Sequence, residues 1–230
     1  RSGHREEEQR ARCFLARLAR SSARSPGPPR TGARAGPGLC GVHAPSMNEE
    51  SRVTKASLSR QIRARNAEVR GEARVEMSRL ACGVLRGRPE WNRAKCVLLY
   101  YPLSDELDLR PVLREALAAG RLVALPRYQA DRGEYEAAII HDEGRDLRPG
   151  WAGILEPGPS CPSVALKRLD LVLVPGLGFD GGGRRLGRGK GFYDRLLVSV
   201  HGIRCGVAGE WQVLGAVPAE PHDEPVDCIL

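Results

Sequence analysis

The chain has 230 residues, of which 41% are hydrophobic, enough to build one sizeable core or two small ones. Its formal net charge of +8 is unevenly distributed, because residues 1–46 hold nine arginines and three glutamates, a net of +6, which leaves +2 for residues 47–230. A broadly basic binding face is therefore not expected on the folded part, and we predict no nucleic-acid partner.

Cysteine spacing and hydropathy exclude further classes. Seven cysteines are scattered without a CxxC pair or a His/Cys cluster, so neither a zinc site nor a disulfide scaffold is indicated. No stretch approaches the roughly eighteen consecutive apolar residues of a membrane helix. We expect a soluble, cytoplasmic monomer with reduced, mostly buried thiols and no membrane contact.

The first 46 residues are rich in Arg, Pro, Gly and Ser and poor in large apolar side chains. Such a composition cannot offset the entropy of ordering the chain, so we predict disorder. The segment is either a transit peptide or upstream sequence outside the functional protein. The second is favoured because transit peptides avoid acids such as the "EEE" at 6–8, and because Met47 directly precedes a helical pattern. The folded domain is therefore placed at 47–230.

The domain begins with a helical pattern from Ser51, and a second helix is predicted at 77–85. "CVLLYYP" (96–102) is a continuous apolar run, as expected for a strand buried on both faces. A helix with Pro111 in its first turn follows, and "RLVALP" (121–126) supplies the next strand. Together these segments form one βαβ unit.

Three more strands are predicted at 135–141, 169–176 and 203–209, with a helix at 191–200 between the last two. Strands that alternate with helices predict an α/β domain with a mostly parallel, doubly wound sheet covered by helices on both faces. In such sheets, ligands bind at the carboxyl ends of the strands.

The stretch "FDGGGRRLGRGKGFYDRLL" (179–197) lies at such a position, after a predicted strand and before a helix. Glycines allow backbone N–H groups to converge on an anion, as in a phosphate cradle. Arg185, Arg188 and Lys190 add side-chain charge that a dinucleotide loop does not usually have. The stretch therefore favours a polyphosphate ligand.

Two familiar phosphate loops do not fit this stretch. A Walker A loop needs Gly where Arg184 stands, and Ser or Thr where Gly191 stands. The dinucleotide fingerprint should follow the first strand of the domain, and this stretch does not. A solvated surface loop is the remaining alternative. Tyr193 and Asp194 weigh against it, because a carboxylate beside a phosphate cradle suits Mg²⁺. Nucleotide phosphate with magnesium is the favoured interpretation.

The string "LVPGLGFDGGGRRLGRGKGFYDRLL" resembles the signature of the 5-formyltetrahydrofolate cyclo-ligase, or methenyltetrahydrofolate synthetase, family. The likeness covers most of residues 55–230 and includes "KASL", "YYPLSDELD", "GRLVALPRY", "GILEP" and "VPAEPHDEPVD". It implies a single three-layer domain, Rossmann-like and NagB/RpiA/CoA-transferase-like. It also implies a ligase that uses magnesium ATP to convert 5-formyltetrahydrofolate into 5,10-methenyltetrahydrofolate, with phosphorylation of the formyl oxygen and release of ADP and phosphate.

The resemblance also implies the site residues. The catalytic residues are Lys190 and Arg188. The ATP contacts are Lys55, Arg185, Leu186, Gly187, Arg188, Gly189, Lys190, Gly191, Phe192 and Tyr193. The substrate contacts are Tyr101, Glu106, Trp151, Arg188, Gly189, Lys190, Gly191 and Phe192, with Glu106 at the pterin ring and the two remaining aromatics as candidate stacking partners. Asp194 and Asp223 are the implied magnesium ligands.

The chain departs from the family pattern at two positions in these motifs. Ser59 stands where the family usually has arginine, and Arg60 and Arg63 are the candidates to replace it. Phe192 replaces a more common tyrosine. The chain also stops at Leu230, where a short terminal strand would be expected to continue.

Two other functions compete with the cyclo-ligase interpretation. One is a non-catalytic relative that acts as an interaction or RNA-binding module, and the other is a sugar-phosphate or CoA-handling enzyme of similar fold. The presence of Glu106, Lys190, Asp194 and Asp223 favours the cyclo-ligase over both.

Overall fold

The computed structural model describes residues 54–230, apart from the side chain of Ala152. The predicted leader at 1–46 and the boundary at Met47 lie outside this range. The five cysteines of the described part are free thiols, four of them buried. Across the same residues, no helix is both long and apolar enough to span a bilayer.

A seven-stranded sheet forms the centre of the domain, and its first five strands run parallel. β3 pairs antiparallel with β2, and β6 pairs antiparallel with β3. The predicted mostly parallel sheet is therefore confirmed. In spatial order the strands are β12 (Cys228–Ile229), β10 (Ile203–Val207), β7 (Leu171–Pro175), β1 (Cys96–Leu98), β2 (Leu122–Gln129), β3 (Glu134–Ile140) and β6 (Ser163–Val164).

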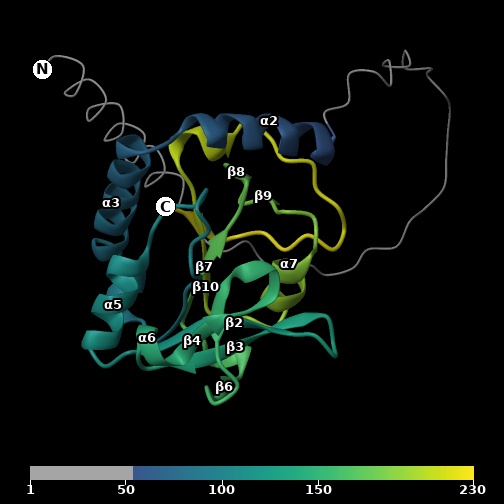
Figure 1. The fold of residues 1–230 in the computed structure, drawn as a ribbon. Helices are drawn as coiled ribbons and strands as arrows, with labels where there is room; N and C mark the ends of the chain where they lie inside the picture. The colour runs from purple at the N-terminus through teal and green to yellow at the C-terminus, as the bar shows by residue number, and fades with distance from the viewer. Residues whose placement is uncertain (1–53) are drawn as a thin grey trace, which may run out of the picture.

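Helices cover both faces of this sheet (Figure 1). α3 (Glu72–Arg86), α4 (Pro89–Arg93) and α5 (Arg110–Ala118) pack on one face, and α7 (Phe192–Leu197) packs on the other. Successive β1 side chains alternate between the two cores, as strand geometry requires: Val97 faces α3 and α5, whereas Leu98 faces α7. The predicted three-layer α/β domain is confirmed.

α2 (Lys55–Glu68) lies across the end of the sheet at which β7 ends (Figure 1). Its buried residues Leu58 and Ile62 pack against Leu177 and Leu186, which follow β7 along the chain. The helix begins with a capping box at Thr54, whose hydroxyl accepts a hydrogen bond from the Ser57 N–H. α2 thus covers the carboxyl ends of the parallel strands.

The glycine-rich stretch is not the single loop that the sequence predicted. Its first half forms a hairpin, in which β8 (Gly178–Asp180) pairs with β9 (Arg185–Leu186), and β11 (Val213–Leu214) extends this small sheet. The turn closes because Asp180 Oδ1 accepts hydrogen bonds from the N–H groups of Gly182 (2.9 Å) and Arg184 (3.1 Å). Only the second half, between β9 and α7, is a loop.

Other elements are shorter or additional. β1 ends at Leu98 instead of 102, and α7 covers 192–197 instead of 191–200. The remaining elements are α6 (Glu143–Asp146), the β4 (Leu147–Pro149) and β5 (Leu155–Pro157) pair, and the 3₁₀ turns η2 (Trp151–Gly153), η3 (Leu166–Arg168) and η4 (Glu210–Gln212).

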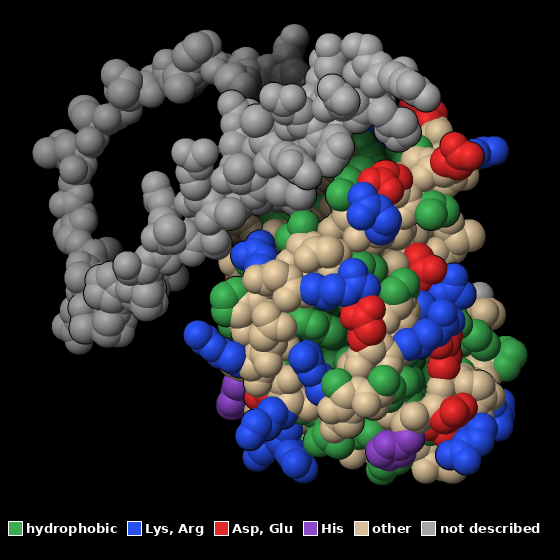
Figure 2. Space-filling view, turned by 90° about the vertical axis from the view of Figure 1, so that its left-hand side faces the viewer, with side chains coloured by type: hydrophobic (Ala, Val, Ile, Leu, Met, Phe, Trp, Pro, Cys, Tyr) green, Lys and Arg blue, Asp and Glu red, His purple; other side chains and the backbone are tan. Residues whose placement is uncertain are grey.

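The face that α3 and α5 cover carries charges of both signs. Figure 2 shows basic and acidic side chains interspersed there among apolar ones. Part of this mixture is paired: Arg86 of α3 and Glu115 of α5 lie 2.6 Å apart. On this face, the described residues therefore form no continuous basic surface.

Candidate active site

A cavity of about 820 Å³ lies at the carboxyl end of the sheet, between α2, the loop after β1, η2 with β5, and the segment from β9 into α7. This is where a doubly wound sheet is expected to bind ligands. The cavity is lined by every predicted site residue: Lys55, Tyr101, Glu106, Trp151, Arg185, Leu186, Gly187, Arg188, Gly189, Lys190, Gly191, Phe192, Tyr193, Asp194 and Asp223.

The loop between β9 and α7 contributes glycines and a lysine to the wall. Gly189 and Gly191 have φ angles of +91° and +63°, which other residues adopt only with strain. The side chain of Lys190 is exposed, and among the described residues it has no ion-pair partner. The cavity wall is therefore formed here by glycine backbone and by a lysine without a described ion-pair partner.

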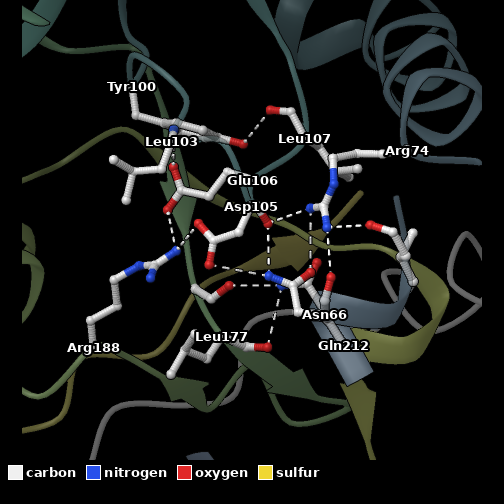
Figure 3. Close-up of polar contacts among 12 residues, drawn as sticks. Asn66, Arg74, Tyr100, Leu103, Asp105, Glu106, Leu107, Leu177, Arg188 and Gln212 are labelled. Atoms are coloured by element: carbon white, nitrogen blue, oxygen red, sulfur yellow. Dashed lines mark hydrogen bonds and ion pairs between the residues drawn. The ribbon is translucent and has the colours of Figure 1, made fainter. Parts of the chain in front are cut away.

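Arg188 joins this loop to the loop after β1 (Figure 3). Its Nη2 lies 2.8 Å from Asp105 Oδ1 and 3.3 Å from Glu106 Oε1. The other Glu106 oxygen accepts a hydrogen bond from the Leu103 N–H at 3.0 Å. Burial raises the pKa of Glu106, although the Leu103 N–H and Arg188 oppose this effect. The Leu103 N–H and Arg188 therefore fix the orientation of the predicted pterin carboxylate.

Asn66 of α2 holds the same loop in place (Figure 3). Its Nδ2 donates to the Asp105 carbonyl at 2.7 Å, and its Oδ1 accepts from Trp211 Nε1 at 3.1 Å. Arg74 of α3 also donates to the Asp105 carbonyl. Buried hydrogen bonds of this kind restrict the loop that carries Glu106.

Asp194, a predicted magnesium ligand, pairs with a buried arginine. Arg185 Nη2 lies 2.9 Å from Asp194 Oδ1, and the two side chains are only 6% and 15% exposed. The Glu224 N–H also approaches Asp194 Oδ1, at 3.5 Å. The start of α7 therefore adjoins the segment that carries the second predicted ligand, Asp223.

Lys55 and Asp223, predicted for ATP and magnesium, form an ion pair. Lys55 Nζ lies 2.7 Å from Asp223 Oδ2 and 3.2 Å from Glu220 Oε2. Burial alone would lower the pKa of Lys55, but hydrogen bonds and charges from the two acids raise it. Burial would likewise raise the pKa of Asp223, and the Lys55 ammonium with the Glu220 N–H lowers it.

Two residues of this corner were not predicted. The ligand atoms of Glu220, His222 and Asp223 lie within 4.8 Å of one another, close enough to share one cation. The acid–His–acid spacing of "EPHD" was the available signal.

The predicted aromatic residues occupy two places in the cavity wall. Trp151 packs with Phe192 and with Tyr128, at ring-centroid distances of 5.5 and 5.6 Å. Tyr101 lies elsewhere, and its hydroxyl donates to Glu143 at 2.9 Å. Tyr135, whose ring centroid is 5.0 Å from that of Phe192, also lines the cavity, but its strand position concealed it in the sequence.

Glu156 of β5 was quoted within "GILEP" without a role. Its Oε2 accepts a hydrogen bond from the Tyr128 N–H at 2.9 Å, and among the described residues its buried Oε1 has no partner of normal geometry. Burial raises the pKa of this carboxyl. The pKa of Tyr135 is raised to about 12, mainly by the burial of its own side chain and secondly by the nearby Glu156 carboxyl.

The chain is similar in sequence to known enzymes. The chain is 28% identical to 5-formyltetrahydrofolate cyclo-ligase of Mus musculus over 199 residues, covering 81% of this chain and 96% of the relative. It is 32% identical to the enzyme of that name from Mycolicibacterium smegmatis over 156 residues, covering 64% and 78%.

Solved structures show the same likeness. The NMR structure of 5,10-methenyltetrahydrofolate synthetase from Aquifex aeolicus matches with a TM-score of 0.69 and 34% identity, covering 76% of this chain and 88% of that one. The sequence pattern of the 5-formyltetrahydrofolate cyclo-ligase family matches residues 51–230. This match covers well over half of the chain, and the chain therefore belongs to the 5-formyltetrahydrofolate cyclo-ligase family of enzymes.

Proposed function

We propose that the chain converts 5-formyltetrahydrofolate into 5,10-methenyltetrahydrofolate with ATP and releases ADP and phosphate. The observation that carries the proposal is that one cavity brings together the residues, from Lys55 to Asp223, for which the family resemblance implies contacts to nucleotide, folate and metal. A cavity of about 820 Å³ is within the range of small-molecule sites.

The loop between β9 and α7 is proposed to bind the ATP phosphates. Its glycine N–H groups and the Lys190 ammonium group supply hydrogen bonds and positive charge. Phosphoryl transfer needs little covalent help from a protein, so positioning and charge neutralisation provide most of the catalysis. Lys190 is the group best suited to neutralise the transferring phosphoryl group, because no acid of the described residues competes for it.

Asp194 and Asp223 are proposed to hold magnesium. Carboxylate oxygens are the donors that Mg²⁺ prefers, and the Glu224 N–H at 3.5 Å from Asp194 shows that the two acids lie on adjoining segments. A bound Mg²⁺ would supply charge neutralisation at phosphate oxygens. In the described structure, Arg185 and Lys55 neutralise these two acids.

The folate is proposed to lie between Glu106 and the aromatic residues. Glu106 can accept N–H groups of a 2-amino-4-oxo ring, and Trp151 and Phe192 offer flat apolar faces. Arg188, held by Asp105 and Glu106, lies between the pterin carboxylate and the phosphate loop. Its guanidinium is therefore suited to donate hydrogen bonds to the formyl oxygen. That oxygen attacks the γ-phosphorus as ADP leaves. N10 then attacks the activated carbon, loses its proton and displaces phosphate.

The test is an assay of the purified full chain with 5-formyltetrahydrofolate. The near-ultraviolet absorbance of the methenyl product should grow only when both ATP and Mg²⁺ are present, with one ADP formed per product. A folded protein that gives no methenyl product, or that hydrolyses ATP without forming it, would contradict the proposal and favour a non-catalytic relative.

A further inference from the structure

The cavity contains five cationic side chains, and the structure divides them into two groups. Three are already ion-paired: Lys55 with Asp223 and Glu220, Arg185 with Asp194, and Arg188 with Asp105 and Glu106. The other two, Arg63 and Lys190, have no ion-pair partner among residues 54–230. Lys190 is already assigned to phosphate, which leaves Arg63 as a guanidinium at the cavity without a described counter-ion.

The place of Arg63 on α2 explains why it reaches the cavity. Lys55, Ser59 and Arg63 are spaced four residues apart, so they follow one side of the helix, and all three line the cavity. At 1.5 Å per residue, Arg63 lies about 12 Å along the axis from Lys55. It therefore stands between the Lys55–Asp223 pair and Asn66, which contacts Asp105.

Arg60, the other arginine considered near Ser59, is placed differently. It is two residues from both Leu58 and Ile62, and therefore about 200° around the helix from each of these buried side chains. Both arginines are exposed, but only Arg63 is among the residues that line the cavity. The helix thus directs Arg60 away from the cavity and Arg63 toward it.

We propose that Arg63 binds the phosphate groups of the nucleotide and provides, one helical turn later, the guanidinium that Ser59 cannot. This inference rests on the proposed function. A guanidinium binds phosphate oxygens through two parallel N–H bonds, and a triphosphate is the most highly charged anion that the proposed reaction brings into the cavity. Two unpaired cations on different elements, α2 and the phosphate loop, then hold the same polyanion.

The experiment measures binding without turnover, by calorimetry on the full chain. A non-hydrolysable ATP analogue with Mg²⁺ and, separately, 5-formyltetrahydrofolate are titrated into wild type, Arg63→Gln and Arg60→Gln. Arg63→Gln should weaken binding of the ATP analogue about tenfold and leave folate binding unchanged, because one charged contact is lost. Arg60→Gln, a matched exchange on the outer side of the same helix, should stay within about twofold of wild type.

A rescue variant tests the exchange of positions. Adding Ser59→Arg to Arg63→Gln returns a guanidinium to the same side of α2 and should restore nucleotide affinity. A double variant as weak as Arg63→Gln would overturn the equivalence of the two positions. Circular dichroism and the melting temperature verify that each variant is folded.

Other outcomes separate this inference from the proposed function. If wild type binds the ATP analogue and Arg63→Gln binds it equally well, the inference fails while the proposed function stands. If Arg63→Gln weakens only folate binding, the anion is a folate carboxylate and the inference is wrong. If wild type binds no nucleotide, the proposed function itself fails.

Discussion

Gly183 and Gly189 belong to the same glycine-rich stretch and have similar φ angles, +81° and +91°, but their surroundings differ. A Cβ on Gly183 would lie 2.2 Å from the Val226 carbonyl oxygen, and the Val226 N–H donates a backbone hydrogen bond to the Gly183 carbonyl. A Cβ on Gly189 would meet nothing within 4 Å. One glycine allows close packing, and the other lies in a loop that borders open space.

The charged residues of the two halves differ in the same way. Asp180 is 4% exposed, and backbone N–H groups satisfy both of its oxygens, including the Val217 N–H at 2.9 Å. Lys190 is exposed and has no described ion-pair partner. The comparison teaches that one low-complexity stretch contains a packed hairpin and a loop that lines the cavity, and that only the contacts of each residue distinguish the two halves.

The largest expected effect is on stability in the hairpin. Gly183→Ala should lower the free energy of unfolding by about 3 kcal/mol or more, because the new Cβ overlaps the Val226 carbonyl and the left-handed φ strains alanine. Gly189→Ala, the matched control, should cost only about 1 kcal/mol through its φ angle. Urea unfolding measures both values, and equal losses would contradict the division into two halves.

Lys190→Met tests the loop half through activity. The variant should change the free energy of unfolding by less than about 0.5 kcal/mol, because the side chain is exposed. Turnover should fall roughly a hundredfold or more if the ammonium group stabilises the transferring phosphoryl group. The exposed Lys167, outside the cavity, provides the control Lys167→Met. Wild-type turnover of Lys190→Met at saturating ATP would remove this lysine from the mechanism.

Asp194→Asn examines the residue that follows the loop. The amide keeps the shape but leaves the buried Arg185 without its charged partner, so the free energy of unfolding should fall by about 2 kcal/mol. The variant should also lose magnesium-dependent activity, measured as turnover against Mg²⁺ concentration. Normal turnover at limiting Mg²⁺ would show that Asp194 is not a metal ligand and would leave Asp223. The nearby acid Asp180 is not an alternative ligand, because backbone N–H groups already bind both of its oxygens.

The smallest expected effect is the pH dependence of the Lys55–Asp223 pair. The folded pKa of Asp223 is lowered, so its stabilisation is complete above the ordinary value of 3.8 and disappears as the pH falls through the folded pKa. The folded pKa of Lys55 is raised, so its stabilisation disappears as the pH rises beyond 10.5. Asp223→Asn should therefore cost about 1 kcal/mol between pH 5 and 9, a typical value for a partly exposed pair, and less at both extremes.

Denaturant unfolding of wild type and Asp223→Asn across this pH range tests the prediction. A difference that persists unchanged well below pH 3.8 would show that the hydrogen bond from the Glu220 N–H, and not the ion pair, makes the contribution.

Local patterns predicted much of the fold. The apolar run at Cys96–Leu98 forms the buried central strand, Pro111 stands in the first turn of α5, and Gly120 follows that helix with a φ angle of +70°. The antiparallel pairing of β3 was not predicted, because the apolar pattern of a strand does not encode its direction. The hairpin at Asp180 was not predicted: its turn is closed by local N–H groups of Gly182 and Arg184, but the Val217 N–H that binds the second Asp180 oxygen is distant in sequence.

By itself, the sequence determined the alternation of strands and helices, the family and the motifs that line the cavity, since these depend on residue type and spacing along the chain. Only the tertiary structure decided which of these groups are free to bind a ligand. Lys55 pairs with Asp223 across 168 positions, and Arg63, not Arg60, faces the cavity. The physical reason is that charge neutralisation and burial depend on distances in space, which a linear pattern does not contain.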